Sequence, residues 1–108
     1  MVARFLRENG YSLVKRNFVT RFGEIDIIAE SAEYILFVEV KTREENAIVP
    51  PEEAVDGKKQ KRLRLAAERF LTLYKTDLQP RFDTALVTVF EKEDRKKGYR
   101  LHYIKNAF

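Results

Sequence analysis

The stretch that most constrains the fold is a pair of adjacent apolar segments, GEIDIIA at 23–29 and YILFVEVK at 34–41. Both are rich in Ile and Val, and the polar residues ESAE between them have the length of a hairpin loop. These features predict two antiparallel strands. Near the loop both strands carry apolar side chains at consecutive positions, which is typical of strands covered on both faces. We therefore expect this hairpin to belong to a sheet that helices cover.

The rest of the chain supplies the helices and three more strands. The expected elements are a helix at 2–9, strands at 11–19, 23–29 and 34–41, a helix at 52–74, and strands at 81–90 and 99–104. Gly57 either weakens the front of the long helix or separates residues 52–57 as a turn. A helix of this length suits a crossover between parallel strands. The expected fold class is α/β, with a mixed β-sheet flanked by helices in the order α-β-β-β-α-β-β and one domain at 1–108.

Composition excludes several classes of protein. The chain has no cysteine, which excludes a disulfide framework, a thiolate metal site and a catalytic thiol. No apolar run approaches the ~18 residues of a membrane span. The opening residues MVARFLRENGY are too short and too charged for a signal peptide. We expect a soluble, cytoplasmic protein with no membrane partner.

Four charged side chains interrupt the apolar pattern at the open end of the hairpin. They are Glu24, Asp26, Glu39 and Lys41. A four-residue loop at 30–33 pairs Ala29 with Tyr34, and this register makes Asp26 a diagonal neighbour of Glu39. Because strand side chains alternate between faces, all four charges are predicted to share one face. The other face of the first strand would carry Ile25, Ile27 and Ala29.

Carboxylates gathered in this way repel one another unless a positive charge lies between them. Lys41 is one candidate for that charge, and a divalent cation such as Mg²⁺ is the other. A bound cation stabilises a phosphodiester under attack, and a nearby lysine can orient or deprotonate the attacking water. The pattern favours metal-dependent phosphodiester cleavage. An ordinary Glu39–Lys41 ion pair on a solvated strand edge is the structural alternative.

A basic run, KKQKRLR at 58–64, carries five positive charges and no negative one, in a chain of net charge +4. Such a patch suits a polyanion, with nucleic acid first and an acidic membrane surface second. The solvated face of an amphipathic helix is the alternative. The candidate phosphate contacts are Arg43, Lys58, Lys59, Lys61 and Arg62, with Arg16 and Arg21 as further candidates.

GEIDIIA followed by FVEVKTR is similar to the PD-(D/E)XK pattern of the restriction-endonuclease-like nucleases. Over nearly its whole length the chain resembles the YraN-like family, small bacterial proteins of uncharacterised function that share this fold. The further matching segments are NGY at 9–11, RN at 16–17, PEEAV at 51–55, RFD at 81–83 and IKNAF at 104–108. The resemblance implies a restriction-endonuclease-like fold and a nuclease-like protein that uses Mg²⁺ or Mn²⁺.

The resemblance also implies roles for individual residues. Asp26, Glu39 and Lys41 take the places of the motif's aspartate, acidic residue and lysine. Asp26, Glu39 and the backbone carbonyl of Val40 would hold the metal, and Glu24 would be a further ligand or a hydrogen-bonding partner. Related nucleases complete the metal site with a glutamate on the N-terminal helix, and this chain begins at Met1, just short of that position.

Three hypotheses follow. The first is a Mg²⁺- or Mn²⁺-dependent endonuclease that acts on DNA, including branched or flapped DNA, with a homodimer as one option because nucleases of this fold often cut as dimers. The second is a nucleic-acid-binding module that kept the fold and lost catalysis, which the missing helical glutamate favours. The third is a protein-interaction domain with an inert acidic pocket. Outside this site, Asp83 is expected to form a structural ion pair or cap, with Arg81 or a basic residue of the long helix as its partner.

Overall fold

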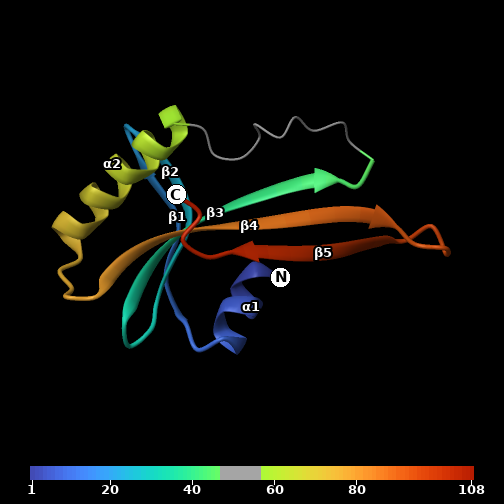
Figure 1. Ribbon diagram of the computed structural model, residues 1–108, viewed down its shortest axis with the longest axis horizontal. Coiled ribbons are helices and arrows are strands. Elements are labelled where there is room, and N and C mark those ends of the chain that lie inside the picture. The colour runs from blue at the N-terminus through green and yellow to red at the C-terminus, as the bar shows by residue number, and fades with distance from the viewer. Residues whose placement is uncertain (47–56) are drawn as a thin grey trace.

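A five-stranded sheet with one helix on each face makes up the part of the chain that the computed structural model describes, residues 1–46 and 57–108 (Figure 1). In chain order the elements are α1 (Val2–Glu8), β1 (Ser12–Thr20), β2 (Gly23–Glu30), β3 (Tyr34–Glu44), α2 (Gly57–Leu73), β4 (Gln79–Glu91) and β5 (Lys97–Ile104). This order confirms the predicted one. Gly57 is the first residue of α2, and the part of the predicted helix at 52–56 lies outside the described residues.

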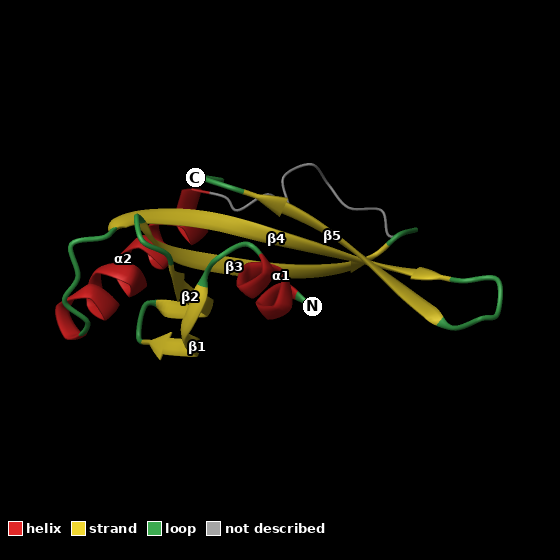
Figure 2. Ribbon diagram, turned by 90° about the horizontal axis from the view of Figure 1, so that it is seen from below, coloured by secondary structure: helices red, strands yellow, loops and turns green. Residues whose placement is uncertain are grey.

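The strands lie in the sheet in the order in which they follow one another in the chain. β3 and β4 are parallel, whereas the other neighbouring pairs are antiparallel. The parallel pair needs a connection that returns the chain to the same end of the sheet, and α2 lies in that connection, as predicted. The fold is therefore an α/β fold with a mixed sheet, consistent with the restriction-endonuclease-like class. Figure 2 shows β4 and β5 extending beyond both helices.

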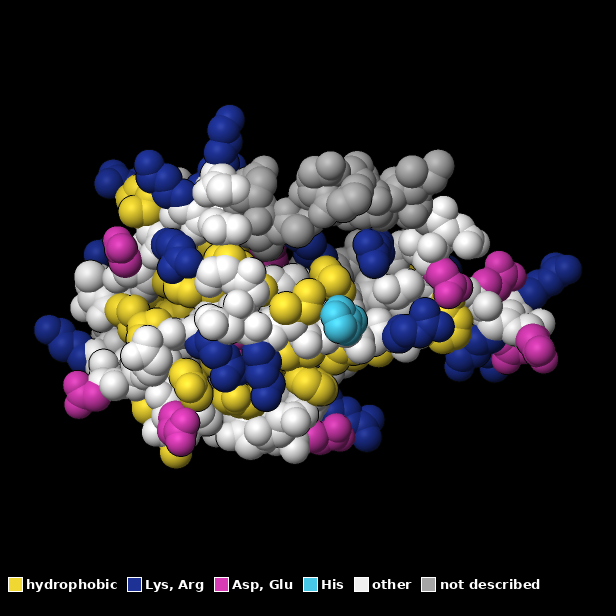
Figure 3. All heavy atoms as spheres, in the orientation of Figure 1, with side chains coloured by type: hydrophobic (Ala, Val, Ile, Leu, Met, Phe, Trp, Pro, Cys, Tyr) yellow, Lys and Arg dark blue, Asp and Glu magenta, His cyan; other side chains and the backbone are white. Residues whose placement is uncertain are grey.

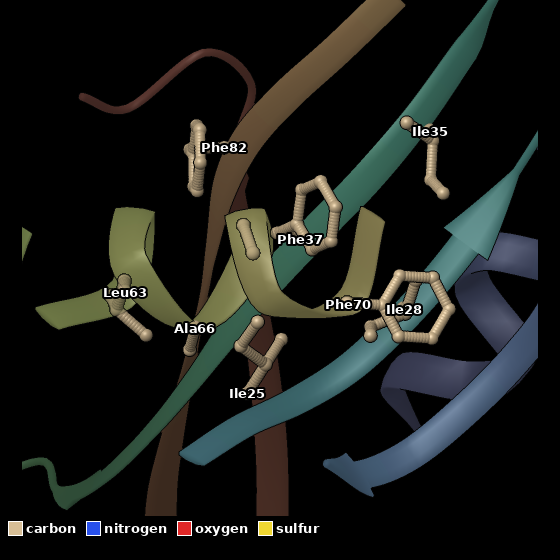
Figure 4. Close-up of a cluster of buried hydrophobic side chains, with 9 residues drawn as sticks. Ile25, Ile28, Ile35, Phe37, Leu63, Ala66, Phe70 and Phe82 are labelled. Atoms are coloured by element: carbon tan, nitrogen blue, oxygen red, sulfur yellow. The ribbon is translucent and has the colours of Figure 1, made fainter. Parts of the chain in front are cut away.

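One apolar layer joins α2 to the sheet. The helix buries side chains at three- and four-residue spacing, namely Leu63, Ala66, Ala67 and Phe70. Phe37 of β3 lies at the centre of this layer (Figure 4). Its ring stacks on Phe82, with centroids 5.4 Å apart, and meets Phe70 edge to face at 6.2 Å. This layer fixes α2 over β2 and β3.

The opposite face of the sheet is covered by α1. A helix of seven residues is too short to be stable by itself, so tertiary packing must hold it. Leu6 is fully buried and packs with Ile27, Leu36 and Val38 of the two central strands. Gly10, the predicted helix stop, has a φ of +87°, a conformation in which glycine is not strained. α1 is thereby held against the centre of the sheet.

The β2–β3 hairpin is tighter than predicted. The Ser31 amide donates to the Tyr34 carbonyl at 2.9 Å, and the Ser31 hydroxyl accepts from the amides of Glu33 and Tyr34. Ala29 consequently pairs with Leu36 and not with Tyr34. The predicted register was wrong by two residues because the serine hydroxyl closes a shorter turn.

The faces of β2 also depart from the prediction. Ile25 and Ile28 pack on the α2 side, whereas Ile27 packs on the α1 side, so the alternation of side chains changes at Asp26. Asn17 lies opposite this point in β1 and has a φ of 51°, a left-handed conformation that asparagine tolerates. The prediction that all four charged side chains share one face of the sheet was therefore wrong, because β1 and β2 are both irregular at this position.

A buried ionic network joins β4 to β5 and to the C-terminal residues. Asp83 is fully buried and accepts from Arg81 Nε at 3.0 Å and Nη2 at 2.9 Å. It also accepts from the Tyr103 hydroxyl at 2.6 Å and the Asn106 amide at 2.8 Å. The predicted structural ion pair of Asp83 with Arg81 is confirmed. With both carboxylate oxygens bonded, Asp83 is a structural residue.

This network predicts a loss of stability at alkaline pH. Burial and the hydrogen bond to Asp83 raise the pKa of Tyr103 far above its usual value of about 10. Since the unfolded chain releases the tyrosine proton first, the stability that Tyr103 contributes is complete below about pH 10 and is lost as the pH rises further. Tyr103→Phe should remove part of this alkaline loss and cost about 1.5–3 kcal/mol near neutral pH. Urea unfolding at neutral pH and above pH 10 measures both, with Tyr99→Phe as an exposed control. An unchanged alkaline slope in Tyr103→Phe would contradict the assignment.

Candidate functional site

The two central strands separate where the charged residues lie. The ladder between β2 and β3 ends at Ile27 and Val38, although β3 continues to Glu44 beside β4. Beyond this point the backbone amide of Val40 donates to Asp26 Oδ2 at 2.7 Å. A carboxylate thus takes the place of a backbone carbonyl in the ladder, and the hydrogen bond is charge-assisted. This bond fixes Asp26 against the backbone of the residue that follows Glu39.

Glu39 approaches the same junction from the α2 side. Its side chain is 6% exposed. One carboxylate oxygen, Oε1, forms an ion pair with Lys59 in the first turn of α2, whereas Oε2 is buried with no hydrogen-bond partner among the described residues. A buried carboxylate oxygen costs free energy unless a donor or a cation reaches it. Glu39 therefore has one oxygen for which the described residues supply no partner.

Asp26 borders a cavity of about 430 Å³ on the α1 side of the sheet. Val40, Arg16, Asn17 and residues 1–3 also line this cavity. Asp26 thus reaches the junction along the sheet, at the Val40 amide, and Glu39 reaches it from the α2 side. Arg16 lies beside the site as expected. Asn17 was missed as an individual residue, and its only signal in the sequence was the RN pair within the family resemblance.

The other two charged residues of the hairpin, Lys41 and Glu24, lie on different faces of the sheet. Lys41 is partly buried and two residues beyond Glu39, on the same side of β3. Glu24 is exposed and pairs with Val19 next to the β1–β2 turn. Since the adjacent Ile25 points toward α2, alternation directs Glu24 to the other face from Glu39. Lys41 therefore shares the face of Glu39, whereas Glu24 does not.

The basic residues lie largely as the sequence indicated. Lys58, Lys61 and Arg62 are exposed at the start of α2, and Arg43 is exposed on the last part of β3. Figure 3 shows Lys and Arg side chains gathered over this end of the helix. Lys59 differs from its neighbours, because its ammonium contacts Glu39. The basic surface and the acidic junction are thus joined by one ion pair.

The composition of the described residues bounds what this site can contain. Within residues 1–46 and 57–108, no three acidic, histidine or cysteine side chains come together as a metal-binding group. Over the same ranges, no helix is long and apolar enough to cross a membrane. Any metal at the junction would therefore rely on two carboxylates and backbone oxygen.

Fold and junction together define a restriction-endonuclease-like α/β domain with an acidic junction between its two central strands. The chain belongs to the uncharacterised protein family UPF0102, whose sequence model matches residues 1–87. It is 38% identical to the UPF0102 protein of Alkaliphilus oremlandii over 111 residues, which cover this whole chain and 91% of that protein. It is 41% identical over 107 residues to the relatives from Acetivibrio thermocellus and Clostridium perfringens. These alignments cover 97% and 98% of this chain and 82% and 85% of the relatives. The resemblance to the YraN-like family is confirmed.

The ion pair at the junction can be tested through stability. Lys59→Met keeps the aliphatic stem and removes the charge, leaving the buried Glu39 without its cation. Breaking a fully buried pair costs about 3–5 kcal/mol, and because the Lys59 side chain is 47% exposed we expect about 1–3 kcal/mol in urea unfolding. Lys58→Met, at an exposed position, should change stability by less than about 0.5 kcal/mol. In a double-mutant cycle with Glu39→Gln, additive effects would contradict the pairing.

Proposed function

We propose that this protein is a metal-dependent nuclease that hydrolyses phosphodiester bonds in DNA. The observation that carries the proposal is the junction of β2 and β3. There the Asp26 carboxylate bonds the Val40 amide directly beside Glu39, whose Oε2 is buried without a partner among the described residues. Carboxylates placed where a sheet opens are costly for stability alone, so their position favours a role in function.

The donors at the junction fit a hard divalent cation such as Mg²⁺ or Mn²⁺. Asp26, Glu39 Oε2 and the backbone carbonyl of Val40 would hold it, and all three are oxygen donors. The orphaned Oε2 is the atom that most needs such a cation. Two carboxylates are sufficient for Mg²⁺, which usually keeps several water molecules. When bound, the metal would stabilise the charge on the phosphate and lower the pKa of a bound water.

The chain's own residues would do the remaining work of positioning and charge compensation. Lys41, on the same side of β3 as Glu39, would orient the attacking water and offset the negative charge that develops on the phosphate. Exposed Lys58, Lys61 and Arg62 would bind the DNA backbone, which positions the substrate without reading its sequence. Arg43 would extend this contact along β3. The homodimer and the cytoplasmic location that the sequence led us to expect for this protein remain predictions.

A second candidate function is a nucleic-acid-binding module without catalysis. Two observations favour it. No third acidic side chain joins Asp26 and Glu39 within the described ranges, and Lys59 already compensates Glu39. In this alternative the basic start of α2 binds the phosphate backbone and the acidic junction serves stability alone.

Metal binding separates the two functions. Asp26→Asn keeps an acceptor for the Val40 amide and removes the charge, so the fold should persist while metal affinity falls. We expect saturable Mn²⁺ binding in calorimetry and a loss of about tenfold or more in the variant, since even supporting residues of metal sites contribute about 10–100-fold. Asp77→Asn, at an exposed position near the end of α2, is the matched control. No saturable binding by the wild-type protein would reject the nuclease in favour of the binding module.

The role of Lys41 is tested by comparing cleavage with binding. Lys41→Ala should lower the rate of Mn²⁺-dependent DNA cleavage by about 100-fold or more, the usual contribution of a positioned acid or base. DNA affinity, measured by fluorescence anisotropy, should change by less than about twofold, because one phosphate contact at most is lost. Lys105→Ala, at an exposed position after β5, is the control. A parallel loss of cleavage and affinity would make Lys41 a binding residue.

A further inference from the structure

A second surface feature lies apart from the acidic junction, between the tip of the β1–β2 hairpin and the second half of α2. It is a groove of about 560 Å³, called here the hairpin groove. The residues that matter for its chemistry are Val19, Arg21, Phe22, Arg69 and Leu73. Among the candidate site residues only Arg21, a further candidate for phosphate contact, lines this groove, and the described lining includes neither Asp26 nor Glu39.

Apolar side chains on both walls of the hairpin groove are left in water. Val19 on the hairpin is 70% exposed, and Leu73 on α2 is 64% exposed. Phe22 is half-buried beside them. Large apolar side chains that stay exposed on the lining of an open groove indicate a surface that is covered when a partner binds.

The charge of the hairpin groove indicates what covers it. Arg21 lies over the ring of Phe22, with its guanidinium carbon 4.9 Å from the ring centroid, and Arg69 stands on the α2 wall. No acidic side chain is among the described residues that line the groove. Arg62 comes close to Gly23 at the start of β2, so the basic surface of α2 continues to this corner (Figure 3). The groove therefore combines apolar and aromatic surface with positive charge alone.

We propose that the hairpin groove binds an unpaired nucleic-acid strand. A base would stack on the flat surface formed by Arg21 and Phe22, and Arg21 and Arg69 would bind the flanking phosphates. Flat apolar faces beside cations are what single strands require, since their bases are open to stacking. A duplex keeps its base faces inside and would leave Val19 and Leu73 uncovered. This inference rests on the proposed function, for which it names the substrate class.

The hairpin groove lies close to the acidic junction along the chain. Phe22 lies in the turn just before β2, four residues ahead of Asp26, a separation of at most about 13 Å at the usual strand rise of 3.3 Å per residue. An unpaired strand in the hairpin groove would bring its adjoining duplex toward the carboxylates. The favoured substrate is therefore DNA in which an unpaired strand meets a duplex.

The test measures binding without metal, on the full chain in EDTA. Fluorescence anisotropy compares a labelled oligothymidine of about 20 nucleotides, longer than usual single-strand sites, with a duplex of the same length. Arg21→Ala/Arg69→Ala should weaken single-strand binding about tenfold or more and duplex binding much less. Phe22→Leu, which keeps an apolar side chain, should weaken single-strand binding about fivefold or more through lost stacking. The control is Arg7→Ala/Arg100→Ala, with the same charge change on exposed positions of α1 and β5.

The results of this binding test can be told apart from those of the metal-binding test of the proposed function. Selective loss of single-strand binding in the groove variants supports the inference, even if the protein binds no metal and the nuclease proposal fails. Equal losses for both probes, or losses no larger than in the control, would overturn it while leaving metal binding at Asp26 untouched. Displacement of the single strand by a synthetic peptide of alternating Glu and Phe, at lower concentration than by unlabelled oligothymidine, would assign the groove to a protein partner and would also overturn it.

Discussion

One hydrogen bond, from the Val40 amide to the Asp26 carboxylate, allows the sheet to open where it does. β3 stays paired with β4 up to Glu44 and Val89, but it leaves β2 after Val38. An amide left unpaired at that point would cost free energy comparable to a lost hydrogen bond. Asp26 supplies the acceptor from a side chain, so the backbone of β2 can move away. A candidate catalytic residue is thus also part of the sheet.

The change of face at Asp26 lies between residues that pack under different helices. Ile25 and Ile28 contact α2, and Ile27 contacts α1, an arrangement that regular alternation cannot provide. The irregular residue between them is therefore directed along the sheet, toward the neighbouring strand. The same packing that stabilises the core places the Asp26 carboxylate at the junction. Core and candidate site are in this sense one piece of structure.

The sequence predicted the order of elements and the parallel β3–β4 pair because both depend on local periodicity and on the length of one helix. It identified Asp26, Glu39 and Lys41 because charges in an apolar strand stand out. The register was missed because it depends on a hydroxyl bond in the Ser31 turn, which has no signature in hydrophobicity. The Lys59–Glu39 ion pair was missed because it joins a helix to a strand, a contact that only tertiary packing determines.

Charge also links the junction to the basic start of α2. A DNA phosphate and a pair of carboxylates repel one another, so a polyanion can approach the junction only if cations lie between them. Lys59 is half-exposed while its ammonium contacts Glu39, so it reduces this repulsion and still faces solvent. Lys58, Lys61 and Arg62 beside it are exposed, so in the proposed function their charge would face the nucleic acid. If the proposed function holds, the Lys59–Glu39 ion pair allows an acidic junction to lie inside a basic surface without repelling the polyanion.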